Sequence, residues 1–395
     1  MRKSDLLKTL VTTILIPILN LAFTTIYIPN ILSVGAFAEW RLASSVIAFA
    51  GILHFGTADG IYRLWLSNKT GKVEVSVVTI NLVLVMVILS SIIVSWMSFR
   101  YLGLGISSLL ALAFSLALAC LFSFSTYYAQ VFFNGNRLRL ALSSQSLLFF
   151  LFVSLLGIYK LESVSLVILS YGLATTPALF LMIFSRSFVI VVDRSVSEAY
   201  NILTLGAPLM TINVLIILFI NLDKFYAKIQ LGNSITFAEY AVRSSLFVAS
   251  CGLGMALGSL LVSKRIHLVK MKIRFIILII TLVLAIAFAG KISIILNLLI
   301  RKYDVDYTGI TVASAGAFVF FLTYVSYGRI HMISASRAIF LTFPFFYITA
   351  VYLQLKFNVS NFSNSSIFAL SVFIGISIIL YEFISYKLRR GVGHV

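Results

Sequence analysis

Basic side chains interrupt otherwise apolar stretches of this 395-residue sequence. Arginine binds an anionic group such as a phosphate through paired hydrogen bonds, and lysine binds it as a point charge. The candidates for this chemistry are Arg41, Arg63, Lys224, Lys228 and Arg243. They fall into two groups far apart in the sequence. We expect the fold to bring Arg41, Lys224, Lys228 and Arg243 near the external end of a path between helix bundles, where they could hold an anionic group. Arg63 is expected to line the entry to a cavity.

Four carboxylates and one histidine accompany these cations: Glu39, His54, Asp59, Asp223 and Glu239. Asp59 and Arg63 are four residues apart, which places them on one face of a helix. Glu239 and Arg243 repeat this spacing. The free imidazole titrates near neutral pH, so His54 is a candidate proton relay. Ion coupling and simple charge pairing remain alternative roles for all five residues.

The composition predicts that these charges lie in a membrane protein. The sequence is 61% hydrophobic and 11% charged, with a mean hydropathy of +1.08, which an ordinary soluble domain does not reach. A charge at the centre of a membrane helix costs about 2.5–3.5 kcal/mol on insertion scales, so it needs a partner or a wet cavity. The alternative is that the long basic side chains reach from helix ends to the membrane surface.

Apolar runs long enough to cross a bilayer recur along the chain and predict an all-α membrane protein with about twelve transmembrane helices. The predicted spans are 9–29, 40–62, 75–98, 107–133, 140–159, 162–184, 206–222, 237–262, 275–298, 308–328, 338–355 and 365–385. The first run continues without a small-residue cleavage pattern, so we interpret it as a retained span.

The basic residues predict the orientation of the spans. The net charge is +18, and the Lys and Arg residues sit in short clusters between spans, which argues against a nucleic-acid partner. Most of the clusters fall on alternate connections, and the positive-inside rule then places both termini in the cytoplasm. The external connections are short, which argues against an enzyme.

Two similar stretches predict an internal repeat. "FAEWRLASSV" begins at Phe37 and "FAEYAVRSSL" at Phe237, and Trp40 stands opposite Tyr240. Each stretch opens the second span of a six-span half, so the halves have the same orientation and form two parallel six-helix bundles. The predicted domains are a bundle at 1–190, a linker at 191–205 and a bundle at 206–395. Chance similarity between apolar sequences is the alternative. Each stretch is followed by a Gly-x-x-x-Gly pair, which allows close helix packing: Gly56 and Gly60, then Gly254 and Gly258.

Three further segments resemble one known family. They are "FGTADGIYRLW", "NGNRLRLAL" and "LGAPLMTINVLIILFINLDKFYAKIQLGNSITFAEYAV". With the repeat and the span count, the chain resembles the polysaccharide-export branch of the multidrug, oligosaccharidyl-lipid and polysaccharide exporter superfamily, and in particular bacterial O-antigen flippases.

The resemblance implies a V-shaped pair of bundles in a bacterial inner membrane. Such a protein passes an undecaprenyl-pyrophosphate-linked oligosaccharide, an O-antigen or similar repeat unit, to the periplasmic leaflet by alternating access. It also implies a cationic central cavity, which Arg41, Arg63, Lys224 and Arg243 could supply.

No cofactor or metal is expected, although H⁺ or Na⁺ coupling is compatible with the acidic residues. The expected partners are membrane lipids, a glycan polymerase and a chain-length regulator, and the chain is expected to be a monomer.

Two alternatives remain open. A cation-coupled multidrug exporter would have the same fold but an acidic cavity. A membrane glycan polymerase or ligase would need a larger external loop.

Overall fold

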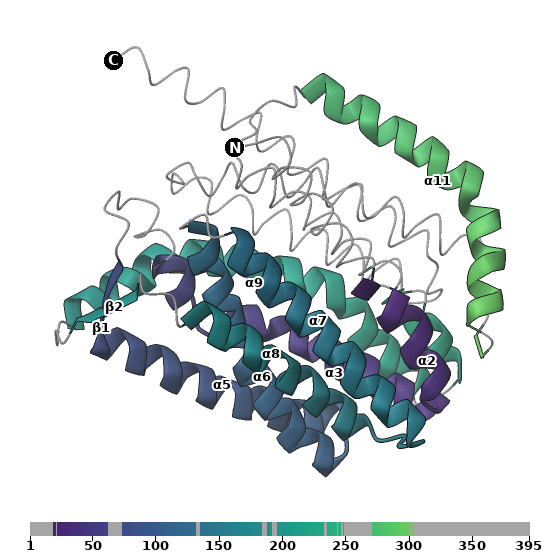
Figure 1. Cartoon of the computed structure of the whole chain (residues 1–395), viewed down its shortest axis with the longest axis horizontal. Helices are drawn as coiled ribbons and strands as arrows, with labels where there is room; N and C mark the ends of the chain where they lie inside the picture. Colours follow the sequence, from purple (N-terminus) through teal and green to yellow (C-terminus); the bar gives the residue numbers. More distant parts are fainter. Residues whose placement is uncertain are drawn as a thin grey trace. The chain divides into compact units, whose positions relative to one another are not determined.

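The protein is described by a computed structural model of residues 1–395. The structure describes residues 19–20, 22–61, 73–131, 135–183, 188–191, 196–232, 235–242, 244–245, 248, 271–300 and 302–303. Its helices and strands are drawn as ribbons in Figure 1. The predicted spans at 308–328, 338–355 and 365–385 lie outside the described residues, as does most of the span at 237–262.

The chain divides into two compact units. Unit 2 is one continuous segment, Ile31–Asn233, and unit 1 combines Met1–Asn30 with Ser234–Val395. The predicted bundles at 1–190 and 206–395 were inferred from the sequence repeat and not from contacts. They stay a prediction.

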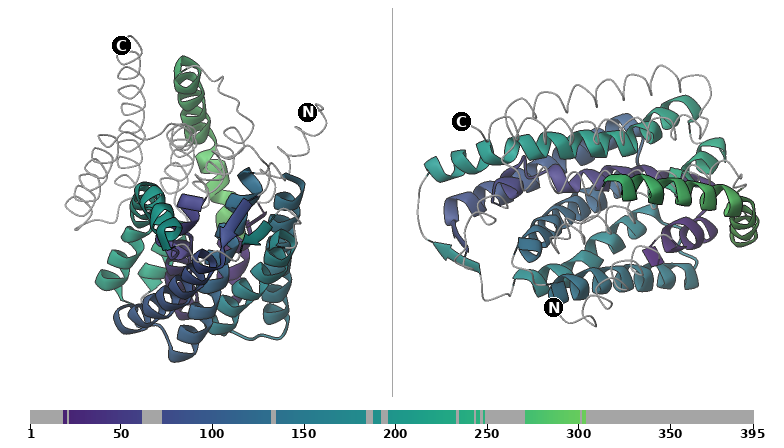
Figure 2. Two further views of the ribbon diagram at one scale, coloured as in Figure 1. Left: turned by 90° about the vertical axis from the view of Figure 1, so that its left-hand side faces the viewer. Right: turned by 90° about the horizontal axis from the view of Figure 1, so that it is seen from above.

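Unit 2 consists mainly of long helices that run alongside one another (Figures 1 and 2). They are α3 (Val34–Ile47), the 3-10 helix η2 (Ala48–Ile52), α5 (Val77–Leu102), α6 (Ile106–Val131), α7 (Gly135–Ile158), α8 (Val164–Ile183) and α9 (Val196–Leu231). The ends of α5 to α8 agree with the predicted spans to within five residues. By length and hydropathy, Val77–Leu102, Ile106–Phe124 and Leu140–Ile158 can each cross a membrane.

The core of unit 2 forms where α6 packs against α8 and α5, and α8 packs against α7. Small and hydroxyl side chains allow these helices to approach closely. Ser115 of α6 donates a hydrogen bond of 2.7 Å to the Ile168 carbonyl of α8, and it lies directly against Gly172. An aromatic cluster also joins α3, α7 and α8, because the Phe149 ring of α7 contacts Trp40 of α3 in a tilted arrangement and Tyr171 of α8 edge to face.

The second predicted span, 40–62, is not one continuous helix. Helix α3 begins earlier, at Val34, where the Ser33 hydroxyl accepts from the Ala36 amide. The helix tightens into η2, turns at 53–56 and becomes helical again at 57–61. Phe55 and Gly56 have φ values of 50° and 82°, which a right-handed helix does not allow. The hydropathy pattern did not predict this break.

The segment after the break makes a very close contact with α9. A Cβ atom added at Gly206 of α9 would overlap the carbonyl oxygen of Gly56, and one added at Gly60 would overlap the carbonyl oxygen of Ile202. The predicted role of Gly56 and Gly60, close helix packing, is therefore confirmed, and the partner is the seventh span.

A short parallel pair of strands was not predicted. Strands β1 (Val73–Ser76) and β2 (Phe188–Val191) pair in register, with Val73 opposite Phe188. β1 leads directly into α5, and β2 comes shortly before α9. The pair therefore connects the chain segments from which α5 and α9 begin.

The described part of unit 1 contains fewer elements. The first span includes the π-helix η1 (Phe23–Tyr27) and the short helix α2 (Ile28–Ile31), whose last residue lies past the unit boundary. The ninth span is α11 (Met271–Leu299), close to the predicted 275–298. The Asn30 side chain donates hydrogen bonds to the carbonyls of Ile26 and Leu299, which joins the first span to the ninth.

The glycine contact predicts different effects for two chemically identical substitutions. Gly206→Ala should destabilise the protein by about 1–3 kcal/mol, because its methyl group has no space beside the Gly56 backbone. Gly35→Ala, at the start of α3, meets no atom within 4 Å and should be neutral or stabilising by up to about 1 kcal/mol. Thermal unfolding of the purified variants in detergent measures both changes. Equal melting temperatures for the two variants would contradict the contact.

Candidate functional site

Three of the five predicted anion-binding residues lie in the described part of unit 2. Arg41 is on α3 with 7% of its surface exposed, Lys224 is on α9 with 1% exposed, and Lys228 follows one turn later and is half-buried. Helices α3 and α9 pack against each other. Unit 2 thus carries these three cations on two neighbouring helices. Arg63 and Arg243 lie outside the described residues, so their roles stay predictions.

Lys224 is among the largest side chains that are fully buried in the described part of the chain. It lies on a buried face of α9 that also contains Asn221 and Ala227. The next residue, Phe225, packs its ring 6.1 Å from that of Phe49 in η2. An ammonium group withdrawn from water needs polar or anionic surroundings. Its position makes Lys224 the strongest candidate for an internal anion-binding residue.

Glu39 has a structural role that the sequence analysis did not predict. One carboxylate oxygen of Glu39 accepts hydrogen bonds from the Gly105 amide at 3.0 Å and from the Ser108 hydroxyl at 2.8 Å. Both donors are at the start of α6, where the amides have no partner within the helix. A carboxylate there is also favoured by the helix dipole. Glu39 therefore caps α6 from α3.

Glu39 also acts on Lys228, which lies beyond the apolar part of α9. Burial lowers the pKa of Lys228, and the negative charge of Glu39 opposes that shift. The pair lies within unit 2, so α3, α6 and α9 share one charge cluster. The two predicted roles of Glu39, ion coupling and charge pairing, stay predictions.

The broken second span contains two completely buried ionisable residues, His54 and Asp59. Asp59 accepts a hydrogen bond of 3.3 Å from the Asn213 side chain of α9. His54 lies in the turn, where its carbonyl accepts from the Thr57 hydroxyl. Neither ring nitrogen of His54 makes a hydrogen bond within the described part of the chain. The structure thus places His54 and Asp59 inside unit 2, and their role in ion coupling stays a prediction.

The remaining two predicted residues are Asp223 and Glu239. Asp223 lies in α9, adjacent to Lys224. Glu239 belongs to unit 1, where its charge and the burial of Tyr303 together raise the pKa of that tyrosine to about 12, burial being the larger cause. Glu39 and Glu239, which the predicted repeat makes equivalent, act on different neighbours.

Sequence reasoning did not predict three residues that support the site: Gly105, Ser108 and Asn213. They contact Glu39 or Asp59 across 66, 69 and 154 positions of sequence. The Gly-x-Gly sequence before "ISS" is typical of the start of a helix. It was the signal in the sequence that could have identified Gly105 and Ser108 as residues at a helix N-terminus. Asn213 interrupts an apolar run and was detectable only as a polar residue within a span.

Among the described residues, no group of three or more His, Cys, Asp or Glu side chains could hold a metal ion. The buried or half-buried charged groups in the described part of unit 2 combine the cations Arg41, Lys224 and Lys228 with the carboxylates of Glu39 and Asp59. Arginine and lysine are the side chains that bind phosphate oxygens, and the role of these cations in binding an anion stays a prediction.

Comparison with solved structures identifies the fold. The chain is similar to the lipid II flippase MurJ in an inward closed conformation, with a TM-score of 0.67, 12% identity, and coverage of 96% of this chain and 87% of that chain. It is similar to an inward-facing multidrug resistance MATE family transporter of the MOP superfamily, with a TM-score of 0.60, 13% identity, and coverage of 97% and 99%. A MATE structure in the straight conformation gives a TM-score of 0.65, 15% identity, and coverage of 95% and 94%.

The protein is therefore an all-helical membrane protein with the twelve-helix fold of the MOP superfamily, as predicted. The similar structures are transporters and not enzymes. By sequence, no family model and no curated protein matches the chain.

The cap on α6 can be tested by removing its acceptor. Glu39→Ala leaves the Gly105 amide and Ser108 hydroxyl without their shared acceptor and should cost about 1–3 kcal/mol of stability. Glu39→Gln keeps an oxygen acceptor and should cost less. Thermal unfolding of the wild type, Glu39→Ala, Ser108→Ala and the double variant gives the stability changes of a double-mutant cycle. A coupling energy near zero would contradict the contact, because residues that share a hydrogen bond are normally coupled by about 0.5–3 kcal/mol.

Proposed function

We propose that this protein is a flippase that moves an undecaprenyl-pyrophosphate-linked oligosaccharide, an O-antigen or similar repeat unit, from the cytoplasmic to the periplasmic leaflet. The observation that supports it most directly is the burial of Arg41 and Lys224 in adjacent helices of a membrane-embedded unit. Two buried cations suit a cargo with a multiply charged anionic group.

The physical task explains why such a cargo needs a protein. Sugars and a pyrophosphate cannot cross hydrocarbon without losing their hydration, whereas the polyprenyl tail can stay in the lipid. The carrier must therefore supply polar groups for the head of the molecule only. Arg41 can bind pyrophosphate oxygens in pairs, and Lys224 and Lys228 can add point charges. Arg63 and Arg243 remain predicted members of the substrate-binding group.

The membrane potential can drive this direction of transport. Moving about two negative charges outward, at about 2.3 kcal/mol per charge per 100 mV, gains about 4.6 kcal/mol in a cell with a negative interior. Coupling to H⁺ or Na⁺ through His54, Asp59 or Asp223 is compatible with the proposal and not required by it. Export that continues when the ion gradients collapse but the potential is held would exclude obligatory coupling.

The proposal includes a bacterial inner membrane with both termini in the cytoplasm. It also includes a monomeric transporter that passes its product to a glycan polymerase and chain-length regulator.

A multidrug exporter is the second candidate, because several of the similar structures are MATE transporters. Such a protein would bind cationic drugs. The buried cations of unit 2 would repel a positively charged drug, which argues against this candidate. A glycan polymerase or ligase, the third candidate, would convert lipid-linked units to longer chains instead of relocating them.

Complementation of a flippase-deficient strain with a matched glycan pathway tests the proposal. The wild-type chain should restore surface glycan. Lys224→Met keeps the side-chain volume but removes the charge, so export should fall roughly 10- to 100-fold, the equivalent of about 1.5–3 kcal/mol for one charged hydrogen bond. Lys224→Arg should retain part of the activity. Surface glycan and the leaflet that holds the lipid-linked intermediate are both scored.

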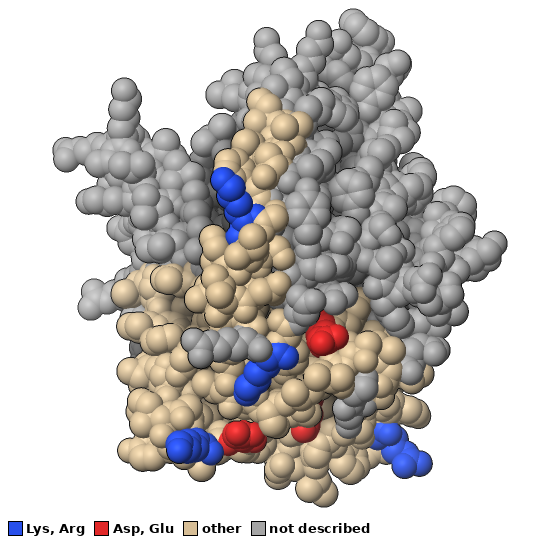
Figure 3. All heavy atoms as spheres, turned by 90° about the vertical axis from the view of Figure 1, so that its right-hand side faces the viewer, with Lys and Arg blue, Asp and Glu red and all other residues tan. Residues whose placement is uncertain are grey.

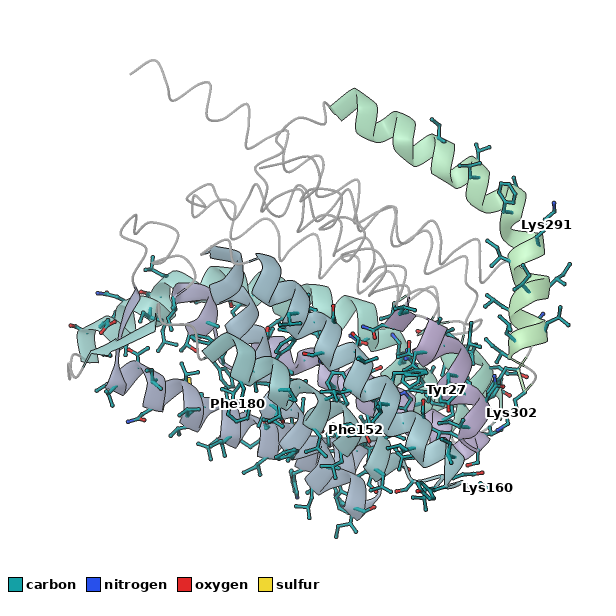
Figure 4. The ribbon with its side chains drawn as sticks, viewed as in Figure 1. Tyr27, Phe152, Lys160, Phe180, Lys291 and Lys302 are labelled. Carbon is teal, nitrogen blue, oxygen red and sulfur yellow. The ribbon has the colours of Figure 1, made fainter. Side chains whose placement is uncertain are left out.

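Two exposed lysines serve as matched controls, Lys160 after α7 and Lys291 in α11. Both are labelled in Figure 4, and Figure 3 shows the charged residues in small, separate groups on one face of the molecule. Lys160→Met and Lys291→Met should export as the wild type does. The proposal fails if the well-expressed wild type leaves the intermediate on the cytoplasmic leaflet. A gain in efflux of cationic dyes would then favour the drug exporter.

A further inference from the structure

The break at 53–56 in the second span lies inside unit 2 and is enclosed by three helices. The Ser90 hydroxyl of α5 donates a hydrogen bond of 3.0 Å to the Leu53 carbonyl. Gly206 of α9 lies against Gly56, and α6 packs against η2, directly before the break. Irregular backbone within a membrane is tolerated only where it is buried in protein or lines a water-filled space. The polar groups of this break therefore depend on partners inside the protein.

The side chain of His54, in the break, has no such partner among the described residues. Its imidazole is completely buried, and neither ring nitrogen makes a hydrogen bond within the described part of the chain. The backbone of Gly51 lies beside the ring without an aligned hydrogen bond, and Cys120 of α6 reaches the His54 backbone. A neutral imidazole has one donor and one acceptor, and leaving them unused when buried is costly. The ring therefore needs a partner that both accepts and donates.

Two serines of α5 have the same need. Ser90 and Ser98 donate to carbonyls four residues earlier in their own helix, at 2.6 and 2.7 Å. Ser91 and Ser95 do not. Their exposed fractions are 1% and 0%, and neither hydroxyl has a hydrogen-bond partner within the described residues. A serine in a helix can bond to its own backbone, so these two hydroxyls are available to a partner from outside the helix.

The spacing of these groups suits one small bridging molecule. Ser91 and His54 directly follow Ser90 and Leu53, which are hydrogen-bonded to each other, so they occur at the same depth in the bundle. Ser95 lies one turn further along α5. Side chains four residues apart on a helix have Cβ atoms about 5–6 Å apart. Two hydrogen bonds of about 2.8 Å can span that gap, whereas one cannot.

A small space lies beside the break. Among the described residues, a Cβ atom added at Gly51 would meet only the Ser123 hydroxyl of α6, at 3.5 Å, which is an ordinary contact. A methyl-sized space with a hydroxyl on its far side therefore separates η2 from α6, within one turn of His54. The neutral molecule of this size that both donates and accepts hydrogen bonds is water. Buried water typically makes about three hydrogen bonds to otherwise unsatisfied polar groups.

We propose that the enclosed break is a binding site for internal water, which bridges the His54 ring to the hydroxyls of Ser91 and Ser95. The site goes beyond the proposed function, because it does not depend on the cargo. Bound water supplies the hydrogen bonds that these buried groups lack, and it fixes the orientation of the imidazole. The residues that form the site all belong to the continuous segment 31–233.

Radiolytic labelling of the purified protein tests for the water. A synchrotron pulse converts bound water to hydroxyl radicals, which oxidise the side chains beside it. Mass spectrometry then measures the labelling of each residue relative to the unfolded protein. His54 and Cys120 should be labelled although both are completely buried, and the equally buried Phe37 of α3 is the apolar control. Labelling of His54 and Cys120 no greater than that of Phe37 would overturn the water site.

Two chemically identical substitutions separate bound water from general opening of the protein. Gly51→Ala fills the space between η2 and α6, so the labelling of His54 and Cys120 should fall to the level of Phe37. Gly35→Ala meets no atom within 4 Å and should leave the labelling as in the wild type. Labelling that is unchanged in Gly51→Ala would contradict the site, because the added methyl group occupies the place of the water.

Melting temperatures distinguish a wet site from a dry one without any labelling. If water bonds to the two serines, Ser91→Ala and Ser95→Ala each remove a hydrogen bond and should lower the melting temperature. In a dry site the same variants remove an unpaired hydroxyl and would leave the melting temperature unchanged or raise it, which would overturn the inference. Ser98→Ala is the matched control, because its hydroxyl bonds to its own helix, and the labelling of His54 should not change. Neither measurement requires the protein to transport the proposed lipid.

Discussion

The burial of Lys224 in a membrane protein is the constraint on which the rest of the account depends. A buried ammonium is costly in hydrocarbon, so a fold that keeps one must surround it with groups that offset the cost. Lys224 lies on the same helix as Lys228 and Asn221, and that helix packs against the one that carries Arg41. In the proposed function, Arg41, Lys224 and Lys228 together would give the site its preference for an anion.

Close packing between helices makes this arrangement rigid. The Gly206 contact leaves no space for a side chain between α9 and the segment after the helix break, so the two backbones are fixed relative to each other. Glu39 fixes the start of α6 in the same way, through Gly105 and Ser108. The cations are therefore presented by elements whose positions are determined by packing and hydrogen bonds outside the charged groups themselves.

Much of the fold was predictable from the sequence, because membrane helices are long and apolar. The spans of α5, α6, α7 and α8 followed from hydropathy alone, and the glycine pair at Gly56 and Gly60 indicated close packing. The break at 53–56 was not predicted, since hydropathy measures composition and not the backbone conformation that Phe55 and Gly56 adopt. Helix α9 also extends well beyond the apolar core at 206–222, to Leu231.

The site was only partly predictable, for a different reason. Charged residues in apolar runs are visible in a sequence, so Arg41, Lys224 and Asp59 could be selected as candidates. Their partners come from elsewhere in the chain, as Asn213 does for Asp59, and spacing gives no information about such pairs. Glu39 was selected for its charge, but its function as a cap on α6 depends on an approach between helices that only the fold determines.

The most direct test of the account is translocation by the purified protein in proteoliposomes, measured in each leaflet for two lipids with the same polyprenyl tail and oligosaccharide. One lipid carries the pyrophosphate and the other has an uncharged linkage in its place. The account predicts rapid, protein-dependent movement of the pyrophosphate lipid and little movement of the uncharged one. Equal movement of both lipids, or movement of neither by active protein, would contradict a site built to carry an anionic headgroup.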